Sequence, residues 1–574
     1  MRHAAAVPGR FSIRQMIARL TPDRWGAATT AVALFVATPL IAVASIALTP
    51  APDIWRHLYD TVLFGYIERT LILIAGLGLG TFVLGTGTAW LVTMCRFPGR
   101  GLFNWALVLP LAVPTYILAF VFTDQLEYAG NLQVALREIF GWRNRQDYWF
   151  PEIRSMGGAI TVMTLVLYPY VYLLARAAFL EQSVCVLEVS RTLGKNAWQC
   201  FWQVALPLAR PAIVVGMTLA MMEALNDFGT VDFFGVKTFT AGIYDVWLNM
   251  DNISGAAQLA SVLMIFVVVL VVLERMARRG QRYHHTSSKI QALPSYQLRG
   301  WRAGLAVAFC ALPVLLGFVL PASVLTSYAL TFFDVTLKAN YLTITLNSIL
   351  LSASAAVAAV AIGLVLAYGL RMGEGPLPRA AVRFASIGYA VPGAVLAIGV
   401  IVPMAALDNT IDHFSERVFG ISTGLLLSGT VVAILYGYLT RFLALSFGTV
   451  EAGLGKVSRN MDGAARTLGA SPLRAMSRIH FPLIRTSLLT AGLLVFVDCM
   501  KELPITIILR PFGYDTLATF VFQYASDELF EESALGALTI VAAGLIPVVI
   551  LALTTLRSRP GHGAAAGGNI GGRA

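Results

Sequence analysis

The chain has 574 residues, of which 57% are hydrophobic and only 13% are charged. Soluble proteins carry about 25% charged residues, so this composition excludes an ordinary water-soluble enzyme or binding domain and indicates a chain surrounded mainly by lipid. The net charge of +11 does not indicate a nucleic-acid partner, because the basic residues gather in loops between apolar runs, where membrane topology and anionic lipid explain them.

Twelve apolar runs are long enough for transmembrane helices, which need about 20 residues each. The first begins near Trp25, after a polar, arginine-rich segment at residues 1–24, and is too long for the apolar part of a signal peptide. The other eleven are expected to begin near Tyr66, Leu102, Gly157, Ala209, Gln258, Ala303, Tyr341, Phe384, Ile421, Ile484 and Glu532. The sequence therefore predicts an all-α integral membrane protein with twelve spans.

Lysine and arginine are unevenly distributed between the loops, and this predicts the orientation of the spans. Residues 1–24, the linker at 277–302 and the tail at 558–574, which is rich in glycine and alanine, are basic, and the loops on the other side are poorer in positive charge. By the positive-inside rule both termini face the cytoplasm. One loop disagrees with this topology, because residues 123–156 carry four arginines: Arg137, Arg143, Arg145 and Arg154.

The chain contains an internal repeat. The segment RTLGKNAWQCFWQVALPLARPAI, from Arg191, matches RTLGASPLRAMSRIHFPLIRTSL, from Arg466, and Gly194 and Gly469 are 275 positions apart, as are Pro207 and Pro482. The sequence thus predicts two six-helix halves, at 25–276 and 303–557, and an unstructured tail at 558–574. Since an even number of spans gives both halves the same orientation, the repeat is parallel, with a path between the halves.

The repeated segment is expected to form a cytoplasmic loop between the fourth and fifth spans of each half. An acidic residue opens each copy, Glu188 or Asp462. The glycine of each copy permits a sharp break between two short helices, and the proline suits the first turn of the next span. A near-identical surface helix in both halves is what a symmetric cytoplasmic partner would bind; the alternative is an amphipathic surface helix without a partner.

These loops resemble the EAA motif of ABC importer permeases. The first copy reads Glu188-Val189-Ser190 where two alanines are usual, and the second reads Asp462-Gly463-Ala464-Ala465. The resemblance covers the whole chain and implies the type I importer permease fold in a bacterial inner membrane, with two copies of an ABC ATPase subunit docked on the loops and a periplasmic substrate-binding protein. The coupling residues that it implies are Glu188, Arg191, Gly194, Pro207, Asp462, Arg466, Gly469 and Pro482.

No Walker sequence, G-x-x-x-x-G-K-[ST], occurs in the chain; Gly455-Lys456 comes nearest and is followed by Val457. We therefore expect a transport subunit that is not an enzyme and holds no cofactor, with ATP and Mg bound by the partner ATPase.

Four acidic residues repeat with the same spacing: Glu223 and Asp227 in the first half, Asp498 and Glu502 in the second. Ionisable residues inside spans are costly and are candidates for function. Carboxylates facing a central path would suit a hard, multivalent cation, so one hypothesis places the four along the substrate path. The alternative is that they pair with each other, with Lys501 or with backbone groups. Neither hypothesis assigns a metal ligand.

The stretch MKELPITIILRPFGYDTLATFVFQYASDELFEESA, from Met500, resembles the ferric iron importer permeases. In that family the substrate arrives on a periplasmic iron-binding protein, so the resemblance implies ferric iron import. Permeases for thiamine, phosphonate or another small solute remain an alternative. An ion-coupled secondary transporter is an alternative from a different class, and it would not need a duplicated docking loop.

Overall fold

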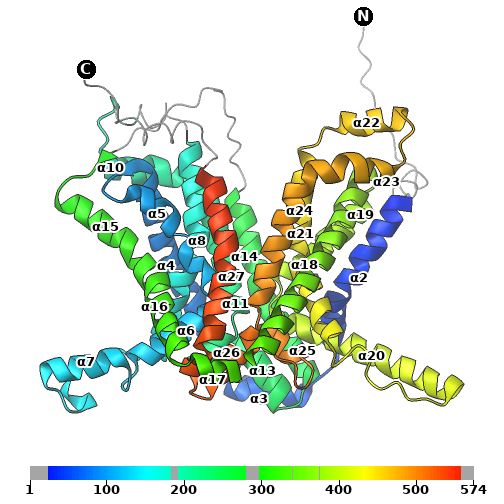
Figure 1. Ribbon diagram of the computed structural model, residues 1–574, viewed down its shortest axis with the longest axis horizontal. Helices are drawn as coiled ribbons and strands as arrows, with labels where there is room; N and C mark the ends of the chain where they lie inside the picture. Colours follow the sequence, from blue (N-terminus) through cyan, green and yellow to red (C-terminus); the bar gives the residue numbers. More distant parts are fainter. Residues whose placement is uncertain are drawn as a thin grey trace, which may run out of the picture. The chain divides into compact units, whose positions relative to one another are not determined.

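The computed structural model describes residues 24–182, 190, 192–278, 296–338, 340–373 and 375–556, and it is almost entirely helical (Figure 1). The helices up to the linker are α2 (Arg24–Ile46), α3 (Pro52–Thr61), α4 (Leu63–Met94), α5 (Arg100–Ala106), η1 (Leu109–Ala112), α6 (Thr115–Leu126), α7 (Asn131–Phe140), η2 (Arg145–Asp147), α8 (Met156–Glu181), α10 (Ala197–Cys200), η3 (Phe201–Ala205), α11 (Leu206–Asn226), α12 (Gly229–Phe233), α13 (Phe239–Tyr244), η4 (Asp245–Asn249) and α14 (Ile253–Arg278).

The helices after the linker are α15 (Trp301–Val314), η5 (Leu315–Val319), α16 (Leu320–Thr331), α17 (Phe333–Lys338), α18 (Tyr341–Met372), α19 (Pro376–Ala385), η6 (Ser386–Ala390), α20 (Gly393–Phe419), α21 (Val431–Gly455), α22 (Arg459–Thr467), α23 (Pro472–Ala475), η7 (Met476–His480), α24 (Phe481–Met500), α25 (Pro504–Leu509), α26 (Leu517–Ser526) and α27 (Phe530–Leu556). Two short strands, β1 (Cys95–Arg96) and β2 (Tyr296–Gln297), pair in parallel.

The membrane spans confirm the expected all-α fold. Within the described ranges, eleven helices are long and apolar enough to cross a membrane, and a bent pair provides a twelfth. That pair, residues 100–112 and 115–140, bends by 92°. Pro110 and Pro114 lie at the bend, where each lacks the N–H that a continuous helix would need. The expected third span is therefore not one continuous helix.

The expected start of the tenth span, near Ile421, is wrong, because α21 begins at Val431. Residues 421–430 are apolar enough to resemble a helix, but Gly424 and Gly429 adopt positive φ angles of 61° and 74°. These left-handed conformations, which favour glycine, interrupt a right-handed helix. Asp408 and Asp412 of α20 accept hydrogen bonds from the N–H groups of this loop.

The chain forms two compact units that do not coincide with the two sequence halves. Unit 1 combines the described residues up to Ser45 with Leu350–Cys499 and Leu509–Phe512, so it contains α2 of the first half together with α18 from Leu350 onward and α19 to α24 of the second. A Cβ on Gly399 of α20 would lie 2.2 Å from the Pro39 carbonyl oxygen of α2. The Thr440 hydroxyl of α21 donates to the Val36 carbonyl at 3.2 Å. The first span therefore packs closely against helices of the other half.

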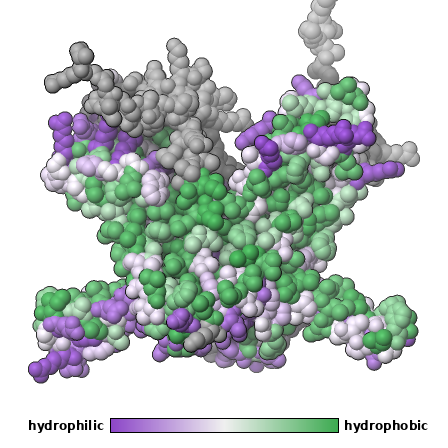
Figure 2. Space-filling view, in the orientation of Figure 1, coloured by the Kyte–Doolittle hydropathy of each residue, from purple (hydrophilic) through white to green (hydrophobic). Residues whose placement is uncertain are grey.

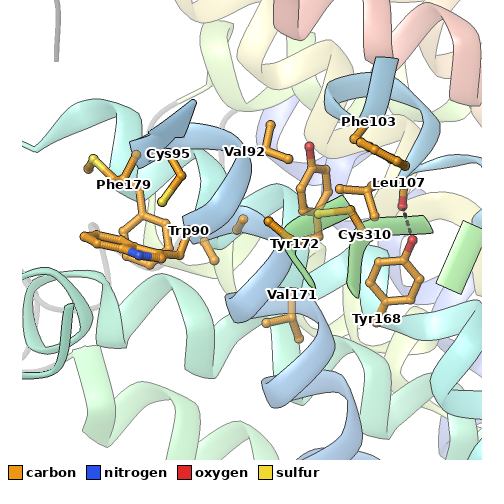
Figure 3. Close-up of a cluster of buried hydrophobic side chains, with 14 of the residues drawn as sticks. Trp90, Val92, Cys95, Phe103, Leu107, Tyr168, Val171, Tyr172, Phe179 and Cys310 are labelled. Atoms are coloured by element: carbon orange, nitrogen blue, oxygen red, sulfur yellow. Dashed lines mark hydrogen bonds between the residues drawn. The ribbon is translucent and has the colours of Figure 1, made fainter. Parts of the chain in front are cut away.

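Unit 2 comprises Ile46–Ile349, Met500–Ile508 and the residues from Gly513 onward, and its core shows the reciprocal arrangement. Cys310 of α15, in the second half's first span, lies in a buried cluster with first-half residues that include Trp90, Phe103 and Tyr172 (Figure 3). The Tyr168 hydroxyl donates to the Leu107 carbonyl at 2.7 Å, so this buried phenol is satisfied. The first span of each sequence half thus lies in the unit that contains spans two to five of the other half.

Candidate coupling loops and membrane acids

Both repeated loops contain the same glycine turn. Gly194 and Gly469 have φ angles of 78° and 75°, and the N–H of the residue after each glycine donates to a carbonyl five positions earlier: Lys195 to Ser190 at 3.1 Å, and Ala470 to Ala465 at 2.9 Å. This is the bond of a Schellman helix ending, in which glycine provides the left-handed residue. The expected sharp break is therefore present in both copies. Glu188 and Arg191 lie outside the described residues.

The acid of the second loop, Asp462, points into unit 1. Its side chain is 16% exposed, and its carboxylate lies 2.7 Å from the guanidinium of Arg371, at the end of α18. Nε2 of His480, in η7, lies 2.7 Å from the other carboxylate oxygen. Arg371 also donates to the carbonyls of Leu454, in the last turn of α21, and of Val457, just after that helix, at 2.6 and 2.9 Å. One guanidinium therefore joins the loop helix α22 to α18 and α21.

Exposed apolar side chains, which sequence reasoning did not select, occupy equivalent positions in the two loops. Leu193 is 72% exposed and Leu468 is 86% exposed, and each directly precedes the turn glycine. Five residues further on, Trp198 is 68% and Leu473 is 63% exposed. The sequence contained a signal for these positions, because an exposed apolar residue that both copies of a polar surface segment share is typical of an interaction surface. Arg466 is also exposed.

Each loop continues into the following span without a break. In the first half, the π-helical turn η3 directly precedes α11, whose second residue is Pro207. In the second half, the π-helical turn η7 directly precedes α24, whose second residue is Pro482. A proline ring would clash with the carbonyl four residues earlier in an α-helix, and the wider turn makes room for it. Both spans therefore extend back into the loops, from Trp198 and from Pro472. A force on α10 or α23 acts directly on the span.

Two of the four membrane acids cap short helices. Asp227 accepts from the backbone N–H and the hydroxyl of Thr230 in α12, at 2.9 and 2.6 Å. Its repeat equivalent, Glu502, accepts from the backbone N–H groups of Ile505 and Thr506 in α25, at 3.0 and 3.1 Å. Backbone groups thus engage both carboxylates. Within the described residues, Glu223 makes no hydrogen bond or ion pair. Asp498 is partly exposed in the last turn of α24.

The two capped turns meet around Tyr116 in unit 2. A Cβ on Gly229 would lie 2.9 Å from side-chain atoms of both Tyr116 and Leu503. Asp227 and Glu502 are both close enough to the Tyr116 hydroxyl to interact with it electrostatically. This hydroxyl is buried and has no hydrogen-bond partner among the described residues. An unpaired buried hydroxyl costs free energy, and this one is within electrostatic range of two repeat-related acids, so Tyr116 is a candidate site residue.

A protein-family model described as "Binding-protein-dependent transport system inner membrane component" matches the chain twice, at residues 81–282 and 359–558. The chain belongs to this family. The double match confirms two fused permease halves, each containing one of the glycine-turn loops. It also places the continuous loop-to-span helices inside the matched regions.

Individual relatives of this permease fall into two groups by coverage. The Fe(3+)-transport system permease protein FbpB 2 of Haemophilus influenzae is 25% identical over 84% of this chain and 89% of its own length. The ferric transport system permease protein FbpB of Actinobacillus pleuropneumoniae is 23% identical over 83% of this chain and 70% of its own length. The molybdenum transport system permease protein ModB of Escherichia coli is 27% identical, over 38% of this chain and 93% of its own length. The chain is thus an ABC transporter permease related to the ferric iron permeases.

Within the described residues of this permease, no group of three or more His, Cys, Asp or Glu side chains is placed to hold a metal ion.

We expect Tyr116→Phe to lower transport without destabilising the permease. The substitution removes a buried hydroxyl that lacks a hydrogen-bond partner, so the melting temperature in detergent should stay constant or rise, and substrate uptake should fall if the hydroxyl serves the path. Tyr168→Phe is the matched control, because its hydroxyl is paired; losing that bond should cost about 1 kcal/mol of stability. Normal uptake by Tyr116→Phe would remove this position from the substrate path.

Proposed function

We propose that this chain is the membrane subunit of a bacterial inner-membrane importer that carries ferric iron into the cytoplasm. The observation that carries the proposal is coverage: the ferric iron permeases match both halves of the chain, whereas the molybdenum permease matches only one. In this proposal ferric iron is the transported substrate and not a cofactor of the chain.

In this proposal two copies of an ABC ATPase, which bind ATP and Mg, dock on the paired loops. The exposed side chains of Leu193 and Leu468 support this docking, because the repeat gives each ATPase copy an equivalent apolar contact. A periplasmic binding protein delivers iron on the opposite side, and both termini are cytoplasmic. The chain itself catalyses no reaction. An ion-gradient transporter would not use the docking loops, so co-purification of an ATPase separates the two classes.

Uptake of radiolabelled ferric iron tests the substrate directly. Cells lacking the gene and any other ferric route should lose uptake, and the intact gene should restore it. The variant Gly194→Val with Gly469→Val should not restore it, because a β-branched residue at φ angles of 78° and 75° is strained by roughly 1–2 kcal/mol at each turn.

The matched control is Gly194→Asn with Gly469→Asn, since asparagine tolerates the left-handed conformation and a Cβ meets no atom within 4 Å at either glycine. Unchanged iron uptake in the deletion strain would leave the permease assignment in place. It would shift the cargo to thiamine, a phosphonate or another small solute.

A further inference from the structure

Helix α7 of unit 2 turns Gln133 and Arg137 toward the protein. Gln133 donates to the Leu126 carbonyl at 2.7 Å and accepts from the Tyr148 hydroxyl at 2.6 Å. Arg137 donates to the Tyr128 carbonyl at 2.7 Å, and its guanidinium lies 4.1 Å from the centre of the Tyr128 ring. The segments before and after the helix therefore cover its polar face.

The opposite face of α7 is apolar and uncovered. Leu132 is 45% exposed, Ile139 is 74% exposed and Phe140 is 60% exposed. Residues spaced by three, four and seven positions share one helix face, and Ala135 completes this stripe. A surface helix in water buries its apolar face against the protein and exposes its polar face. The arrangement of α7 is the reverse, which is favourable only where the surroundings of the helix are themselves apolar.

The same inversion occurs at the equivalent position of the other half, in unit 1. The C-terminal part of α20 places Asp408, Asp412 and Ser415 on one face, and all three bond to the returning loop. Asp408 accepts from the N–H of Leu427 at 2.9 Å, Asp412 from that of Thr423 at 2.6 Å, and Ser415 donates to the Ile421 carbonyl at 2.8 Å.

The other face of α20 is exposed and apolar with helical spacing: Leu407 (53%), Ile411 (38%), Phe414 (62%) and Val418 (55%). The repeat spacing of 275 residues relates Asn131–Phe140 to residues 406–415. The exposed apolar helix face therefore occurs at equivalent positions in the two halves. Different side chains produce it in each half, which argues against a chance arrangement.

The charges around α7 are mostly compensated within the segment. Arg145 pairs with Glu152, and Arg154 pairs with Glu127. Asp147 accepts from the N–H groups of Asn144 and Arg143, and these bonds hold the pKa of its carboxyl below the usual range. The arginine excess that disagreed with the positive-inside rule is therefore largely neutralised locally. The rings of Phe140, Trp142 and Tyr148 stack at 4.7 and 4.6 Å, and Trp149 is 86% exposed.

We propose that residues 127–154 and 407–430 are two interfacial anchors, whose apolar stripes lie in the phospholipid at the membrane–water boundary. Trp and Tyr are enriched at that boundary, and an amphipathic helix lies there with its apolar face in the acyl region. In unit 2 the anchor lies at the end away from α10, and in unit 1 it lies at the end away from α22 (Figure 1). Figure 2 shows hydrophobic residues along one side of each projecting segment and hydrophilic residues at its lower edge.

The test uses the full chain in phosphatidylcholine vesicles, with a fluorescent label on a single introduced cysteine at Ile139 or Phe414. The four native cysteines among the described residues are buried, and the unsubstituted chain gives the labelling background. Glu138→Cys and Glu416→Cys are matched controls, because both side chains are exposed on the same helices off the apolar stripes. Brominated phosphatidylcholine reports contact with lipid, and aqueous iodide reports contact with water.

We expect brominated lipid to quench the labels at positions 139 and 414 strongly and iodide to quench them weakly, with the reverse at 138 and 416. Equal iodide quenching at all four positions would overturn the proposal. Iodide quenching at 139 and 414 that disappears only when a periplasmic binding protein is added would also overturn it, because the stripes would then be a receptor surface. The result does not depend on which solute the permease carries.

Discussion

Arg371→Met is expected to abolish uptake and to lower the stability of the permease. The substitution leaves Asp462 without its ion-pair partner and leaves the carbonyls of Leu454 and Val457 without their donor. Because the two side chains are only 10% and 16% exposed, removing one partner of this largely buried pair should cost about 3–5 kcal/mol. Thermal unfolding in detergent measures the stability, and uptake in cells measures the transport.

Two variants separate lost stability from lost coupling in this cluster. Arg379→Met is the matched control, because that arginine is exposed in α19 and its removal should leave both stability and uptake unchanged. Arg371→Met combined with Asp462→Leu leaves no unpaired charge, which should restore part of the stability, although the Leu454 and Val457 carbonyls and His480 still lose their partners. If the pair carries force from α22 to α18, uptake should stay low in the double variant. Normal uptake by Arg371→Met alone would refute the role of this cluster.

Replacing Leu193 and Leu468 with aspartate together should release the partner ATPase while leaving the permease folded. Both side chains are exposed, so the melting temperature should not change. Loss of an apolar contact at the centre of an interface costs about 2 kcal/mol, which corresponds to roughly 30-fold weaker binding at each loop. Co-purification of the ATPase and iron uptake should both be lost.

The control for this prediction is Leu193→Met with Leu468→Met, which keeps an apolar side chain of similar volume at each position. Retention of the ATPase by the aspartate double variant would show that the leucines lie outside the docking surface. In that case the neighbouring Trp198 and Leu473, which are also exposed, would become the next positions to replace.

The repeat allowed the fold and the loops to be predicted, because helix periodicity, glycine turns and repeat spacing are local signals. Gly194 and Gly469 have the predicted conformation for this reason. The contacts of Asp462 could not be predicted, since Arg371 lies 91 positions away and no local pattern connects them. The start of α21 was misplaced because apolar content alone does not distinguish a helix from a loop that is hydrogen-bonded to Asp408 and Asp412.

The acids show the same limit of sequence reasoning. Their repeat spacing identified four candidates together, but the caps made by Asp227 and Glu502 depend on how the chain turns after each span. Tyr116 was not selected, because a tyrosine in an apolar run has no local feature that reveals an unpaired hydroxyl. In the same way, the arginine-rich loop was noticed from its charge, whereas the inverted faces of α7 and α20 required the side-chain contacts.

The exchanged first spans have a consequence for biosynthesis. The hydrogen bond between Val36 of α2 and Thr440 of α21 joins residues 404 positions apart. At a synthesis rate of about 5–20 residues per second, α2 enters the membrane roughly 20–80 s before that partner exists. During this interval its close-packing surface, including the Pro39 carbonyl that Gly399 later covers, faces lipid or an insertion factor. Fusion of the two halves in one polypeptide guarantees that the partner arrives in the same place.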